Sequence, residues 1–177
     1  TNRGRHYHAD IFKALVKDVN QQGIDHVLVT GDVTNLALED EFRFARTLFD
    51  ELELGPEGVT VLPGNHDAYV QEGATHFAAH FADYFRSDQD YRAEDWPLVR
   101  VRDGVALFGV SLGLQLPWFT AYGVIGDTQL ARLAEYLADP AFANMVRIVA
   151  IHHPPAGPPA KSRVRGLRDR DGLAEVL

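Results

Sequence analysis

The spacing of apolar residues along the chain alternates between helical and extended patterns. Four stretches place apolar side chains at three- and four-residue intervals, which puts them on one face of a helix. These stretches are marked by Ile11, Phe12, Leu15, Val16 and Val19, by Phe42, Ala45, Leu48, Phe49 and Leu52, by Phe77, Phe81 and Phe85, and by Leu130, Leu133 and Leu137. Short β-rich runs lie at 26–30, 59–62 and 146–151, and 98–110 is typical of a hairpin that turns at Asp103-Gly104. This order of elements predicts helices covering a mixed sheet.

The length of the chain favours a single domain. With 177 residues and 46% hydrophobic content, it can fill one core, so we assign 1–177 to one domain. It opens at Thr1 and stops at Leu177, inside a pattern typical of a helix that is just gaining its apolar stripe. We therefore expect the domain to be incomplete at both ends.

Charge and composition exclude several classes of partner. The net charge of −8 argues against binding of a nucleic-acid polymer or an anionic membrane, because both need a concentrated basic face. The chain has no cysteine, so a metal would be held by oxygen and imidazole ligands. No apolar run approaches the roughly 20 residues that span a bilayer. These features suit a cytoplasmic protein.

Polar residues follow three of the predicted strands directly. Gly31-Asp32 follows the first strand, 64–67 (GNHD) follows the second, and 152–155 (HHPP) follows the last. In an open α/β sheet, ligands bind beyond the carboxyl ends of the strands, so parallel neighbours would bring the three clusters together. Aspartate, asparagine and histidine form an oxygen and nitrogen set that suits a divalent ion.

Each cluster also has a simpler interpretation. Asp32 after a glycine fits an Asx turn or a helix cap, and Gly64-Asn65 is an ordinary turn dipeptide. His152 and His153 fit loop histidines held by the prolines that follow them. Three independent turns would rarely all present metal-binding groups at strand ends, so their joint occurrence favours a metal site.

The sequences GDVTN at 31–35, GNHD at 64–67 and HHPP at 152–155 resemble the calcineurin-like metallophosphoesterase family. The resemblance implies an α/β fold, a four-layer αββα sandwich of mixed β-sheets flanked by helices. It also implies two divalent metal ions, manganese, iron or zinc, at the strand ends. The implied reaction is hydrolysis of a phosphate ester by hydroxide that the two metals activate.

The resemblance also implies a role for each motif residue. Asp32 corresponds to the carboxylate that bridges both metals, and Asn65 corresponds to a ligand of the second. His152 corresponds to a further ligand, with His153 as the alternative one residue away. His66 would protonate the leaving oxygen or stabilise charge, with Asp67 orienting it.

Two family motifs are not found in their places. The family pattern begins with Asp-x-His before the first helix and ends with Gly-His-x-His, and we expect both to lie just outside 1–177. If either is replaced by other residues in the protein, a scaffold or binding protein with a degenerate metal site is the alternative to an enzyme.

The substrate class is less constrained. The HHPP motif is closest to the cyclic-nucleotide phosphodiesterase branch of the family, so a small phosphodiester is the first choice and a phosphomonoester the second. Trp118, Phe119 and Tyr122 could form an apolar lip for the substrate, or belong to the core. One basic run could grip an anionic substrate or form a solvated loop face, and it comprises Lys161, Arg163, Arg165, Arg168 and Arg170.

Overall fold

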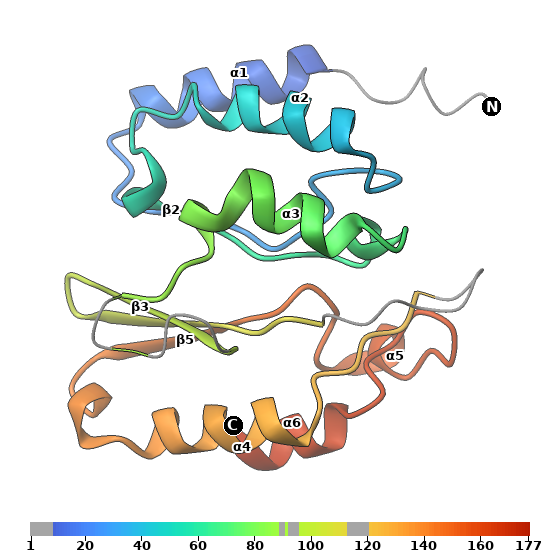
Figure 1. Ribbon diagram of the computed structural model, residues 1–177. Helices are drawn as coiled ribbons and strands as arrows, with labels where there is room; N and C mark the ends of the chain where they lie inside the picture. The colour runs from blue at the N-terminus through green and yellow to red at the C-terminus, as the bar shows by residue number, and fades with distance from the viewer. Residues whose placement is uncertain (1–8, 89–90, 92–95, 113–120) are drawn as a thin grey trace.

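The computed structural model of the chain shows four layers, helices over two sheets and then further helices (Figure 1). It describes residues 9–88, 91, 96–112 and 121–177. The first helical layer contains α1 (Ala9–Gln21), α2 (Glu39–Phe49) and α3 (Gly73–Phe81), and the last contains α4 (Asp127–Ala138) and α6 (Arg170–Val176). Short helices are α5 (Gly157–Ala160), η2 (Pro56–Gly58), η3 (His66–Ala68), η4 (Ala82–Tyr84) and η5 (Pro140–Phe142). The αββα sandwich that the sequence predicts is confirmed.

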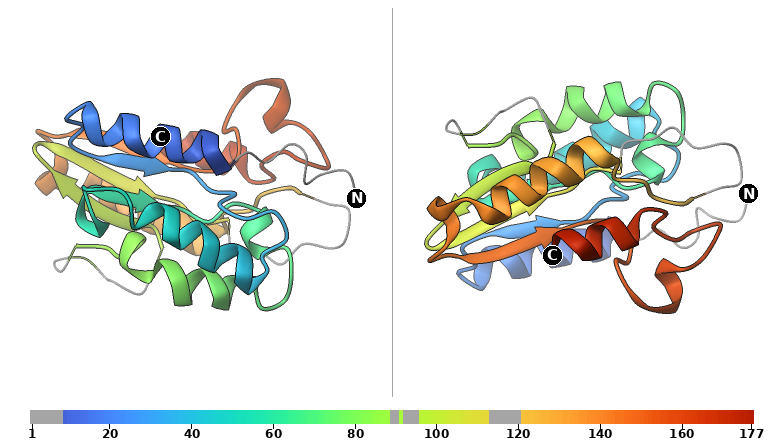
Figure 2. Two further views of the ribbon diagram at one scale, coloured as in Figure 1. Left: turned by 90° about the horizontal axis from the view of Figure 1, so that it is seen from above. Right: turned by 90° about the horizontal axis from the view of Figure 1, so that it is seen from below.

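The strands form two small sheets. In the first, β1 (Val27–Val29) and β2 (Val59–Val61) pair in parallel, with Val27 opposite Val59. In the second, β3 (Leu98–Arg102) and β4 (Val105–Gly109) form an antiparallel hairpin, and β4 pairs in parallel with β5 (Val146–Ala150). The carboxyl ends of β1, β2 and β5 point to the same end of the molecule (Figure 2). This arrangement brings the three polar clusters of the sequence to one place.

The hairpin turn lies where the sequence predicts it. Asp103 and Gly104 connect β3 to β4, with φ angles of 44° and 82°. Positive φ at both central positions gives the turn the twist that suits two antiparallel strands, and aspartate followed by glycine is a favoured pair there.

Apolar side chains fill three layers between the elements. One cluster lies under the first helices, around Phe42, Phe49 and Phe81, and another lies against α4, around Phe108 and Leu133. A smaller cluster joins the two sheets, formed by Leu62, Leu98, Leu107 and Ala150 with Trp96 beside them. Burying each large apolar side chain is worth about 1.5–3 kcal/mol, so these layers hold the strand ends in position.

The third helix is shorter than its apolar spacing predicts. α3 ends at Phe81, the chain continues as η4, and Phe85 lies beyond both. The phenylalanine rings still meet, with the centroids of Phe77 and Phe85 5.2 Å apart. The buried guanidinium of Arg100 donates to the carbonyl oxygens of Asp83 and Arg86 at 2.9 Å. These carbonyls are bonded to Arg100 and not to helical amides.

Candidate metal centre

Two glycines allow the loops after β1 and β2 to touch through their backbones. A Cβ placed on Gly31 would lie 2.5 Å from the amide nitrogen of Gly64, and one placed on Gly64 would lie 2.2 Å from Oδ1 of Asp32. Gly31 also has a φ of 111°, which a residue with a side chain rarely adopts. Both motif glycines are thus required for Asp32 and Asn65 to approach each other.

The carboxylate of Asp67 holds these two loops together. The side chain is buried, with 1% of its surface exposed. Its Oδ2 accepts hydrogen bonds from the amides of Asp32 and Gly64 at 2.9 Å and of Val33 at 3.3 Å. Its Oδ1 accepts from the amide and the hydroxyl of Thr34, each at 2.9 Å. Burial raises the pKa of Asp67, and the hydrogen bonds from Gly64, Thr34 and Val33 oppose that rise.

His152 reaches the same place from the second sheet. Its Nδ1 lies 2.7 Å from the carbonyl oxygen of Thr30, which can only accept, so Nδ1 carries the proton. Its Nε2 lies 3.1 Å from Oδ1 of Asn65 and 3.4 Å from Oδ1 of Asp32. A histidine that donates one ring N–H to a backbone carbonyl presents the other nitrogen as a metal ligand.

His66 is held beside this cluster and not within it. Its backbone amide donates to Oδ1 of Asp32 at 2.9 Å, and its ring Nδ1 lies 2.8 Å from the carbonyl oxygen of Asn35. The ring stacks on Tyr69, with centroids 5.9 Å apart. The sequence assigns the orienting role to Asp67, whereas the orienting contact in the structure is the Asn35 carbonyl. The Asp67 carboxylate is occupied by the loop amides.

His153 points away from Asp32 and Asn65. Its ring is buried, and Nε2 lies 2.6 Å from the carbonyl oxygen of Ala121. Its Nδ1 is buried with no hydrogen-bond partner among the described residues, and burial lowers the pKa of the ring. Of the two adjacent histidines, the structure therefore brings His152 to the cluster and uses His153 to contact the segment 121–123.

The resulting donor set is small but chemically consistent. Asp32, Asn65 and His152 contribute a carboxylate, an amide oxygen and an imidazole nitrogen, a set that fits a divalent ion of the manganese, iron or zinc type. Within the ranges that the structure describes, no group of three or more His, Cys, Asp or Glu side chains is placed to hold a metal. Asp32, Asn65 and His152 are therefore candidates for part of a coordination shell.

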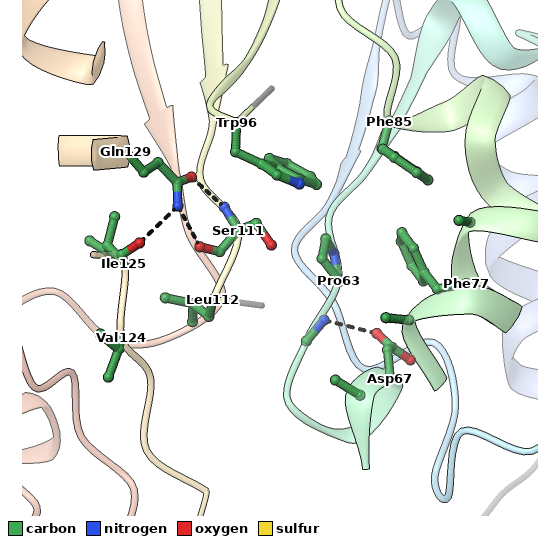
Figure 3. A pocket seen from close by; sticks show the side chains of 14 residues that line it. Pro63, Asp67, Phe77, Phe85, Trp96, Ser111, Leu112, Val124, Ile125 and Gln129 are labelled. Atoms are coloured by element: carbon green, nitrogen blue, oxygen red, sulfur yellow. Dashed lines mark hydrogen bonds between the residues drawn. The ribbon is translucent and has the colours of Figure 1, made fainter. Parts of the chain in front are cut away.

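An apolar cavity of about 490 Å³ is lined in part by Gly64 and Asp67 of the loop after β2 (Figure 3). Phe77 and Phe85 line one wall, and Leu112 and Ile125 line the other. The amide of Gln129 faces the cavity but is already bonded to the backbone of Ser111 and Ile125. The cavity is thus an apolar space beside the candidate centre.

The aromatic residues that the sequence proposes as a lip are only partly placed. Trp118 and Phe119 lie outside the described residues. Tyr122 is described and half-buried, and its ring lies under the guanidinium of Arg168, with Cζ 4.0 Å from the centroid.

The comparison with known protein families agrees with this arrangement. Residues 6–175 match the family described as calcineurin-like phosphoesterase, which covers nearly the whole chain. The chain belongs to the calcineurin-like phosphoesterase family. No curated protein gives a significant match. Phosphoester hydrolysis is the general activity of calcineurin-like phosphoesterases, and the family generally uses divalent metals.

The calcineurin-like phosphoesterases are hydrolases, so membership of this family supports an enzyme. Within the described ranges, no helix combines the length and the apolarity needed to cross a membrane.

Sequence reasoning missed two supporting residues of the site. Thr34 and Asn35 stand in the GDVTN motif, yet the sequence gives a role to Asp32 alone. Their contacts, the Thr34 hydrogen bonds to Asp67 and the Asn35 carbonyl to His66, join residues more than 30 positions apart. The signal was the motif itself, because a polar pair that follows Gly-Asp after a single valine lies in the same loop as the candidate ligand.

Proposed function

We propose that the protein is a metal-dependent phosphoesterase that hydrolyses a small phosphodiester, or else a phosphomonoester, with two divalent ions. The observation that supports this proposal is the convergence of three side chains from three strand ends. Nε2 of His152 lies 3.1 Å from Oδ1 of Asn65 and 3.4 Å from Oδ1 of Asp32. These are acceptor atoms, and a divalent cation is the natural partner of three convergent acceptors.

The residues divide the chemical work. Asp32 would contact both metals, Asn65 the second, and His152 would be a further ligand. Bound divalent ions supply Lewis-acid stabilisation of phosphate charge and lower the pKa of water. His66 would donate a proton to the leaving oxygen through Nε2, because Nδ1 is engaged by the Asn35 carbonyl. Asp67 would keep the loops of Asp32 and Asn65 docked. We also infer a cytoplasmic location, which the lack of cysteine favours.

The test is metal removal and reconstitution. Purified protein is stripped with a chelator, reloaded with manganese, iron or zinc, and assayed on an aryl phosphodiester and an aryl phosphomonoester. We expect hydrolysis only after reloading, with the diester preferred.

Variants of the proposed ligands connect metal content to activity. Asp32→Ala and Asn65→Ala should lower both metal per chain, measured by elemental analysis, and turnover. Asp40→Ala is the matched control, because Asp40 is exposed on α2, where it pairs with Arg43. Unchanged metal content in both ligand variants would contradict the assignment.

The alternative is a scaffold or binding protein on the same fold, because a fold does not fix a function. The observation that favours it is the absence of a three-residue His, Cys, Asp or Glu cluster among the described residues. A folded protein that binds none of the three metals and hydrolyses neither ester would support the scaffold.

A further inference from the structure

The segment 160–170, called here the basic lobe, concentrates positive charge in an acidic chain. It carries Lys161, Arg163, Arg165, Arg168 and Arg170 against a single carboxylate, Asp169, whereas the whole chain has a net charge of −8. Among the described residues, no carboxylate forms an ion pair with any of the first four, and Arg170 has only an exposed contact with Asp171 at 3.5 Å. Elsewhere, arginines such as Arg43, Arg46, Arg86 and Arg102 are ion-paired, whereas Lys161, Arg163, Arg165 and Arg168 have no such pair within the described part of the chain.

The backbone of the basic lobe is fixed by its own contacts. The amide of Gly166 donates to the carbonyl of Ser162 at 2.8 Å, and the amide of Leu167 donates to the carbonyl of Ala160 at 3.1 Å. A Cβ on Gly166 would lie 2.2 Å from the oxygen of Ala160, so the turn is closed tightly. The cations are therefore presented from an ordered frame, which lowers the entropy cost of binding a ligand.

Hydrogen bonds connect the lobe to His153, the residue next to the candidate ligand His152. The segment 121–123 pairs with it, because the amide of Ala121 donates to Val164 and the amide of Gly123 donates to Gly166, each at 2.9 Å. The carbonyl of the same Ala121 accepts from Nε2 of His153, the neighbour of His152. Figure 2 shows the lobe projecting at the end of the molecule to which the carboxyl ends of β1 and β2 point.

Two cations of the lobe are available for a ligand. Arg163 and Arg165 flank Val164, the residue bonded to Ala121, and both are exposed. Arg168 has a structural role instead, because its guanidinium covers the ring of Tyr122 and donates to the carbonyl oxygen of Arg163 at 3.2 Å. Unpaired guanidinium groups on a fixed frame suit a phosphate, which accepts their paired N–H donors.

We propose that Arg163 and Arg165 bind a second phosphate group of the substrate, so that the preferred substrates are small phosphoesters with at least two phosphates. This inference rests on the proposed function, since the first phosphate is the one that is hydrolysed at the metal centre. Because the rest of the chain carries net negative charge, an additional anionic group on the substrate is attracted most strongly at the lobe.

The experiment uses two p-nitrophenyl diesters of one nucleotide that differ only by a second phosphate on the sugar. For the metal-loaded protein we expect kcat/KM to be about tenfold higher for the diester with the second phosphate, mainly because KM is lower. A tenfold change is about what two exposed ion pairs contribute to binding. The double variant Arg163→Gln/Arg165→Gln should lose this preference, mainly through a higher KM for the diester with the second phosphate. Arg43→Gln, an exposed arginine on α2, is the matched control and should keep it. Equal loss on both diesters, or an unchanged preference, would overturn the inference.

A binding measurement separates this inference from the proposed function. If neither diester nor an aryl phosphomonoester is hydrolysed, the phosphoesterase proposal fails, and calorimetry with inorganic pyrophosphate then tests the lobe alone. Pyrophosphate binding that the double variant loses and the control keeps supports the lobe as a phosphate site, and binding that the double variant retains overturns it. A single-stranded oligonucleotide that displaces pyrophosphate at lower concentration than free nucleotide would assign the lobe to a polymer, contrary to the proposal.

Discussion

Replacing Asp67 by asparagine tests whether this residue holds the two ligand loops or orients His66. The carboxylate accepts five hydrogen bonds, three at Oδ2 and two at Oδ1. Asparagine keeps one acceptor oxygen and turns the other position into a donor. The less costly orientation directs the new amide at Thr34, whose hydroxyl can rotate to accept, while the backbone amide of Thr34 is left without its partner.

The expected cost can be worked out from these contacts. An unsatisfied buried amide costs about 1–3 kcal/mol, and the remaining bonds weaken because they lose a charged acceptor. Relief of the desolvation that raises the pKa of Asp67 offsets part of this loss. We expect Asp67→Asn to lower the free energy of unfolding by roughly 2–4 kcal/mol. For a chain of this size, that lowers the melting temperature by roughly 5–12 °C.

The assay is thermal and urea unfolding of Asp67→Asn beside wild type and Asp40→Asn. Asp40 has 87% of its side chain exposed, so the same chemical change there should shift stability by less than about 0.5 kcal/mol. If Asp67→Asn melts within about 1 °C of wild type but loses turnover, then Asp67 acts through His66, and its role in docking the two loops is wrong.

Four further outcomes are expected. His66→Ala should keep its metal, by elemental analysis, while losing about 10²- to 10⁴-fold in turnover on a substrate with a poor leaving group. His152→Ala should lose metal and activity together, and retention of the full metal content would contradict its assignment. Burial, and after it the charge of Arg100, lowers the pKa of His26. As pH falls below about 6.5, the unfolded chain therefore takes up a proton before the folded chain does, and the stability of the protein falls. His26→Gln should show a smaller drop in melting temperature than wild type between about pH 7.5 and about pH 5.5. Arg100→Met should cost about 3–5 kcal/mol in urea unfolding, because four buried or part-buried carbonyl oxygens lose their donor, whereas Arg43→Met should cost under about 1 kcal/mol.

The elements and the meeting point of the motifs could be predicted from the sequence. Apolar runs such as 59–62 are strong signals for buried strands, and parallel strands bring the loops at their carboxyl ends to one edge. The approach of Asn65 to His152 agrees with this expectation. Family resemblance through GNHD and HHPP then supplied the fold, which the match over residues 6–175 confirms.

Contacts between distant loops could not be predicted in the same way. Alternation in the run 98–102 (LVRVR) puts Arg100 and Arg102 on one face, typical of a strand side open to solvent. In the structure Arg100 is 1% exposed, because backbone carbonyls from Pro56, Val59, Asp83 and Arg86 surround its guanidinium. Such a pocket of carbonyls is made by the tertiary fold and leaves no periodic trace.

The roles of adjacent residues were also hard to separate by position alone. His152 and His153 are one residue apart and have the same chemistry, so only the direction of each ring distinguishes them. The ring of His152 faces Asp32, and that of His153 faces Ala121. Whether His152 binds metal stays a prediction until metal content is measured.

The division of the candidate ligands between two sheets has a consequence for how the site could diverge. Asp32 and Asn65 follow strands of the first sheet, and His152 follows a strand of the second. Between these sheets lies the thin layer of Leu62, Leu98, Leu107 and Ala150. A change in the size of one of these side chains would slide one sheet over the other and alter the spacing of the ligand atoms, although it touches none of them. If the three residues bind metal as proposed, preference for ions of different radius would then be tuned from the interior of the sandwich, with every residue of the three motifs left in place.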